Sequence, residues 1–68
     1  MTLQEKIGRN LKKIREEKKL TQAEVANAAE INVNYYAKIE RGEANASTET
    51  LEKLAGALKV KSSDIFPF

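Results

Sequence analysis

The chain has 68 residues, a formal net charge of +2, and neither Cys nor His. This length predicts one domain over residues 1–68, and a domain of this size buries only about 60% of its unfolded surface. Disulfides and the usual zinc sites are excluded. Helix packing or self-association must therefore provide the stability that a small core lacks.

The composition also argues against an enzyme, because no imidazole is available as a general base and no thiol as a nucleophile. The sequence indicates no cofactor, no metal site and no small-molecule ligand. It has no signal-peptide pattern and no run approaching the roughly 20 apolar residues of a membrane span. We therefore expect a soluble, cytoplasmic protein that does not associate with membranes.

Helical periodicity predicts a first element over residues 3–18. Its apolar face consists of Leu3, Ile7, Leu11 and Ile14. A second helix is predicted from Gln22 to about Ala29, because Thr21 and Glu24 have the spacing of a capping box. Residues of the first segment also carry most of the positive charge, which is typical either of a solvated helix face or of a nucleic-acid surface.

A third helix is predicted after Asn32, a favourable N-cap residue, with Gly42 as its C-terminal stop. A fourth helix is capped by Ser47 or Thr48. Its buried stripe is Leu51, Leu54, Ala55 and Leu58. A last single turn is capped by Ser62 or Ser63. No strand pattern appears, so the sequence predicts a compact, all-α bundle of five helices.

The second and third helices, joined by a short turn, are the most informative feature. Such a helix-turn-helix, here over about residues 22–41, places a helix in the DNA major groove in many small proteins. Ala26 is small enough for the two helices to approach closely. Tyr35 and Tyr36 are adjacent, and we expect Tyr36 to face inward and Tyr35 outward. The polar outer face of the third helix is then Asn32, Val33, Asn34, Tyr35 and Lys38.

These residue types suit contact with DNA. An Asn amide can bond adenine bidentately, Val33 can contact a thymine methyl group, and Lys38 can donate to guanine or to a phosphate. The Tyr35 hydroxyl and Gln22, at the positive end of its helix, suit phosphate contacts. Simpler interpretations stay open: Asn32 as an N-cap alone, Val33 as part of the core, and the others as ordinary surface residues.

Four motifs in this order resemble the XRE (Cro/C1-type) helix-turn-helix family, which includes small phage repressors and restriction–modification controller proteins. They are Thr-Gln-x-x-Val-Ala, Tyr-x-x-x-Ile-Glu-Arg-Gly, Thr-Leu-x-x-Leu-Ala-x-Ala-Leu and Asp-Ile-Phe. The resemblance covers about residues 8–66. The resemblance implies a lambda-repressor-like five-helix bundle. It also implies a transcriptional regulator that binds a palindromic operator in double-stranded DNA as a homodimer.

The resemblance also implies roles for individual residues. The DNA-binding positions are Gln22, Asn32, Val33, Asn34, Tyr35, Lys38, Arg41 and Asn45. Arg15 of the first helix is expected to form a structural ion pair with Glu40 at the end of the third. The sequence departs from the family at Lys19 and Glu30, where Gly is common, and at Ala46, where Pro is common. A residue other than Gly at positive φ is strained.

The end of the chain, Phe66-Pro67-Phe68, has more apolar surface than one short turn can bury. We therefore predict a dimer interface of Val60, Phe66 and Phe68, the alternative being that Phe66 only covers the core. The leading functional prediction is a sequence-specific DNA-binding regulator that acts as a homodimer. The alternative is a helical protein-interaction module, such as an antitoxin or adaptor, with little DNA binding.

Overall fold

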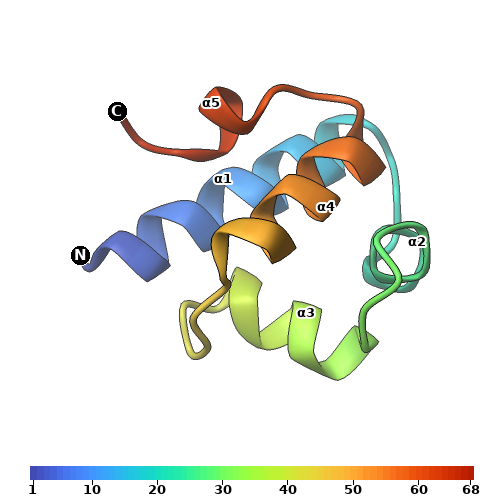
Figure 1. The fold of residues 1–68 in the computed structure, drawn as a ribbon, viewed down its shortest axis with the longest axis horizontal. Coiled ribbons are helices and arrows are strands. Elements are labelled where there is room, and N and C mark those ends of the chain that lie inside the picture. The colour runs from blue at the N-terminus through green and yellow to red at the C-terminus, as the bar shows by residue number, and fades with distance from the viewer.

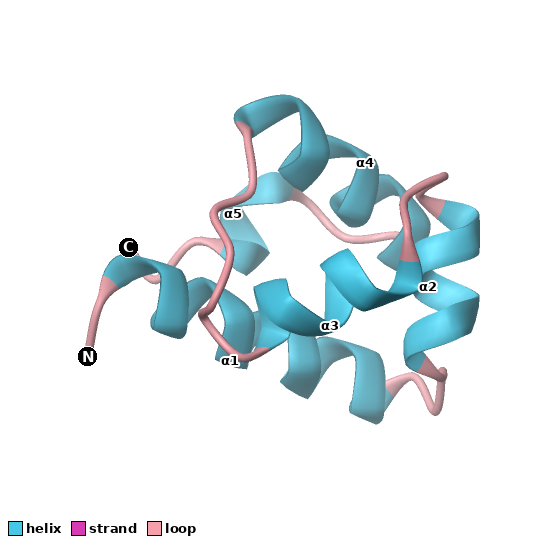
Figure 2. Cartoon of the chain, turned by 90° about the horizontal axis from the view of Figure 1, so that it is seen from below, coloured by secondary structure: helices cyan, strands magenta, loops and turns pink.

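The computed structural model describes residues 1–68 as five helices without a strand. These are α1 (Leu3–Glu17), α2 (Gln22–Ala28), α3 (Val33–Glu40), α4 (Thr48–Leu58) and α5 (Ser62–Ile65). The predicted all-α bundle is confirmed, and α1 and α2 each end one residue before the predicted boundary. In Figure 1, α3 lies beneath α1 and α4, with α2 at one end of the molecule. The two chain ends lie on the same side of the molecule in Figure 1 and in Figure 2.

Side-chain caps fix the starts of three helices as predicted. The Thr21 hydroxyl accepts from the Glu24 N–H at 3.0 Å, and the Glu24 carboxylate accepts from the Thr21 N–H at 2.8 Å. Asn32 and Ser47 accept from backbone N–H groups in the first turns of α3 and α4. Each cap satisfies backbone donors that the first turn of a helix leaves unpaired.

The predicted cap of α5 is wrong. Ser62 is already helical, and neither Ser62 nor Ser63 provides the cap. Instead, the Asp64 carboxylate accepts from the Lys61 N–H at 3.0 Å. The acidic half of a capping box therefore holds this short turn without a hydroxyl partner.

A single hydrophobic core receives residues from all five helices. Its buried members are Ile7, Leu11, Val25, Ala26, Ala29, Tyr36, Ile39, Leu51, Leu54, Ala55, Leu58 and Ile65. Tyr36 is fully buried while Tyr35 is half-buried, which confirms the predicted orientation of this pair. Leu3 differs from the predicted apolar stripe, because it borders an open cavity at the start of α1 and stays 48% exposed. No helix is both long and apolar enough to cross a membrane.

Helices α1 to α4 share one kind of ending. Lys19, Glu30, Gly42 and Lys59 follow them with φ of 58°, 59°, 75° and 58°. In each case the next residue donates its N–H to a carbonyl five positions earlier, as in Leu20 to Arg15 at 3.1 Å. This is the Schellman arrangement, in which a left-handed residue lets the chain satisfy the last carbonyls of a helix. Three of the four positions lack the glycine that this conformation favours.

Candidate nucleic-acid interface

One side of α3 is free of contacts with the core. Its inner positions, Tyr36, Ile39 and Glu40, are buried. The four predicted base-facing residues, Asn32, Val33, Asn34 and Lys38, are all exposed. The Asn32 side chain uses its oxygen to cap the helix at 2.8 and 3.1 Å. Its amide nitrogen remains a donor for a second partner, so capping and base contact are compatible.

The inner side of α3 is fixed by the predicted ion pair, which the structure contains. Arg15 Nε lies 2.7 Å from Glu40 Oε2, and Arg15 Nη2 lies 3.2 Å from Glu40 Oε1. Arg15 also donates to the Leu20 carbonyl at 2.8 Å. The Glu40 side chain is only 2% exposed. Burial alone raises the pKa of Glu40, but the hydrogen bonds from Arg15 and Gln22 outweigh it and lower that pKa below its ordinary value.

Gln22 belongs to the same network, which the sequence did not reveal. Its amide Nε2 donates to Glu40 Oε1 at 2.9 Å. An amide nitrogen has two N–H groups, so one remains for the predicted phosphate contact. The Tyr36 hydroxyl is buried beside this network without a hydrogen-bond acceptor. Burial and the neighbouring Glu40 carboxylate raise the pKa of Tyr36 well above its ordinary value, so this hydroxyl stays protonated.

Helix α1 approaches the end of α3 at the backbone. A Cβ atom on Gly8 would lie 2.4 Å from the Ile39 carbonyl oxygen and 2.5 Å from that of Glu40. Only glycine fits at this position. The role of Gly8 did not follow from the sequence, where a glycine inside a helical pattern only lowers helix propensity.

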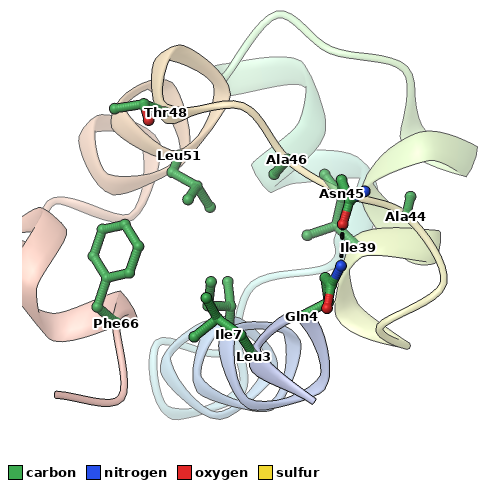
Figure 3. A pocket seen from close by; sticks show the side chains of 10 residues that line it. All are labelled: Leu3, Gln4, Ile7, Ile39, Ala44, Asn45, Ala46, Thr48, Leu51 and Phe66. Atoms are coloured by element: carbon green, nitrogen blue, oxygen red, sulfur yellow. Dashed lines mark hydrogen bonds between the residues drawn. The ribbon is translucent and has the colours of Figure 1, made fainter.

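The loop between α3 and α4 holds the remaining predicted DNA residues. Arg41 and Asn45 are exposed, and Arg41 Nε lies 3.1 Å from the Glu43 carboxylate. The Tyr35 hydroxyl donates to the Asn45 carbonyl at 2.9 Å. Because a tyrosine has one O–H donor, the predicted Tyr35–phosphate contact requires this bond to open. Gln4 Nε2 donates to Asn45 Oδ1 (Figure 3), a contact that the sequence did not indicate.

An apolar surface lies between the start of α1 and the end of the chain. Leu3, Phe66 and other residues line an open cavity of about 310 Å³ (Figure 3). The Phe66 ring lies 5.8 Å from that of Phe68, which is 88% exposed. Val60 is separate from this surface, because it lies beside Ile14 near the other end of α1. The structure therefore brings two of the three predicted dimer residues together.

Comparison with known proteins gives a consistent result. A family model described as helix-turn-helix matches residues 11–65. The chain is 46% identical over 59 residues to the immunity repressor protein of Bacillus phage phi105, covering 87% of this chain and 41% of the repressor. It is 37% identical over 62 residues to the control protein C.MunI of Mycoplasma sp, covering 90% of this chain and 84% of that protein.

The fold is similar to solved structures as well. The restriction-modification controller protein C.AhdI from Aeromonas hydrophila matches with a TM-score of 0.91 and 32% identity, over 93% of this chain and 96% of that one. The clp gene regulator ClgR from C. glutamicum matches with a TM-score of 0.92 and 31% identity, over 96% and 84%. The chain spans less than half the length of the phage repressor and nearly the whole of C.AhdI.

Proposed function

Since the chain belongs to the XRE-type helix-turn-helix family of DNA-binding transcriptional regulators, we propose that it binds double-stranded DNA with α3 in the major groove. The observation that carries this proposal is the outer face of α3. Four side chains able to contact base edges are exposed there together, while the opposite face is fixed in the core. One relative is an immunity repressor, and repression is the regulatory outcome that we propose.

Three of the remaining predicted residues are proposed to position the protein on the DNA backbone. Gln22 retains one free N–H at the start of α2, and Arg41 and Asn45 are exposed in the loop that follows α3. Contacts of this kind set register and orientation but carry little sequence information. Base preference is therefore assigned to α3, and sequence-independent affinity to the α2 end and the loop.

We further propose that the protein acts as a homodimer on a palindromic operator. The supporting observation is the apolar surface formed by Leu3, Phe66 and Phe68 between the start of α1 and the end of the chain. A two-fold pairing would place two copies of α3 about 34 Å apart, one turn of DNA. Val60, which lies apart from this surface, is proposed only as a peripheral contact.

The DNA-reading role is tested at Asn34. Duplexes selected from a random library define the preferred sequence of the wild-type protein, and the affinity of Asn34→Ala is then measured on that sequence and on random DNA. We expect a loss of about 1–3 kcal/mol on the preferred sequence, with relaxed preference at one base pair, because one amide reads one base. Asn27→Ala, an exposed amide on α2, is the matched control and should bind normally.

Two outcomes would argue against this proposal. Equal losses of affinity on preferred and random DNA would show that Asn34 contacts the DNA backbone and does not read a base. An absence of any selected sequence at about 50 mM salt would favour the protein-interaction module instead. Binding to DNA should weaken steeply as salt rises, because phosphate contacts release counterions.

A further inference from the structure

We propose that Gln4 is a positioning residue for DNA binding: its hydrogen bond to the Asn45 side chain holds that amide at the place from which it contacts the phosphate backbone. This inference rests on the proposed DNA-binding function and extends it to α1, which has no residue among the predicted DNA contacts.

Asn45 is bonded from two different helices. Its backbone carbonyl accepts from the Tyr35 hydroxyl of α3 at 2.9 Å, and its side-chain oxygen accepts from the Gln4 amide of α1. Figure 3 shows the second bond at the rim of the apolar cavity, across from Phe66. The loop between α3 and α4 is thus clamped to both helices at a single residue.

The Gln4 bond occupies one end of the Asn45 amide and leaves the other end free. An amide has a carbonyl that only accepts and a nitrogen that only donates. In the structure the Gln4 nitrogen donates to the Asn45 oxygen, so the N–H groups of the exposed Asn45 amide keep their donor capacity for another partner. A phosphate oxygen only accepts, so donors of this kind are what a backbone contact requires.

Without Gln4, the Asn45 side chain loses its hydrogen bond to α1 and gains rotational freedom. This freedom has to be lost again when DNA binds, which weakens binding. Gln4 therefore acts on DNA through Asn45 and touches no base. Its removal should weaken binding to preferred and random DNA by similar factors, unlike the removal of Asn34.

A double-mutant cycle with Gln4→Ala and Asn45→Ala tests this role. We expect Gln4→Ala to weaken binding roughly three- to tenfold, the scale of one hydrogen bond. In the Asn45→Ala background the same change should have no further effect. The thermal midpoint should stay near that of the wild type, since Gln4 is exposed. Asn27→Ala again serves as the matched exposed-amide control.

Hydrogen exchange provides a readout that does not depend on DNA. The Glu43 amide, which donates to the Lys38 carbonyl at 2.9 Å, should exchange several-fold faster in Gln4→Ala and in Tyr35→Phe, because each variant opens one side of the clamp. Unchanged exchange in Gln4→Ala would overturn the clamp. An affinity loss that persists in the Asn45→Ala background would overturn positioning and make Gln4 a direct contact. Failure of the wild-type protein to bind DNA would instead reject the proposed function, with the exchange data still deciding the clamp.

Discussion

Glu40 is the residue through which α3 is held by its neighbours. Its carboxylate accepts from Arg15 of α1 and from Gln22 of α2, so three helices meet at two oxygens. A carboxylate this deeply buried is stable only while its donors remain. The orientation of α3 relative to the rest of the protein is thereby linked to a few hydrogen bonds rather than to apolar packing alone.

Breaking this pair from one side should be costly. We expect Arg15→Met or Glu40→Leu alone to lower the free energy of unfolding by about 3–5 kcal/mol, because each leaves a buried charge without its partner. The double variant should recover most of that loss, since two apolar groups replace two charges. Urea denaturation of the four proteins measures this. If each single variant had a free energy of unfolding within about 1 kcal/mol of the wild-type value, the pair would have the energy of an exposed ion pair, against this prediction.

Glu40 also makes the stability of the protein depend on pH in the acid range. The folded-state pKa of Glu40 is lowered from its ordinary 4.5, so its contribution is complete above that pH. The contribution is lost as the pH falls through the lowered folded value, where the carboxylate becomes protonated. Stability measured from pH 6 downward should therefore fall less steeply in the Arg15→Met/Glu40→Leu double variant than in the wild type.

At the scale of elements, α1 and α3 approach so closely that one added methyl group would disrupt their contact. Gly8→Ala should destabilise the protein by about 1–3 kcal/mol, because the new Cβ would meet two carbonyl oxygens at 2.4 and 2.5 Å. Gly56→Ala is the matched control. That glycine is also helical, has nothing within 4 Å of a built Cβ, and should gain about 0.5–1 kcal/mol from helix propensity.

Thermal or urea unfolding of the two variants measures the contrast between them. Similar stabilisation by both substitutions would show that α1 can shift away from α3 without loss. A selective loss in Gly8→Ala, together with weaker DNA binding, would show that the position of α3 depends on this contact.

Local signals explain what the sequence could predict about these elements. Thr21, Asn32 and Ser47 cap helices through bonds within three residues, so their roles follow from short-range chemistry. Arg15–Glu40 came only from the family resemblance, because the two residues are 25 positions apart. Gln22 to Glu40 and Gln4 to Asn45 also join distant segments, and neither contact has a periodicity that could indicate it.

At the scale of the whole molecule, the apolar surface at the chain ends remains without a partner in the single chain. The core of a 68-residue chain gives only marginal stability. Association would therefore stabilise the fold as well as set the spacing of two α3 helices. Phe68→Ser should raise the dimer dissociation constant at least tenfold, because the ring is 88% exposed in one copy and would be buried between two.

Sedimentation equilibrium over a micromolar concentration range measures that constant. Lys53→Ser, at an exposed site on α4, is the control and should leave it unchanged. A wild-type protein that stays monomeric at high micromolar concentration would contradict the pairing surface. If pairing is correct, Phe68→Ser should also weaken binding to a palindrome more than binding to a single half-site.

The left-handed residues after α1, α2 and α4 imply that the melting temperature of this protein is well below the value that the fold could reach. A side chain in the left-handed conformation costs about 1–2 kcal/mol of stability, which glycine avoids. Part of that gain is offset, because glycine has more conformational freedom to lose when the chain folds. Lys19→Gly and Lys59→Gly should each raise stability by about 0.5–1 kcal/mol, or several degrees in a domain of this length. Lys18→Gly, at φ −89°, should do the opposite. The measured difference between these neighbours would indicate how little surplus stability natural selection has maintained in this fold.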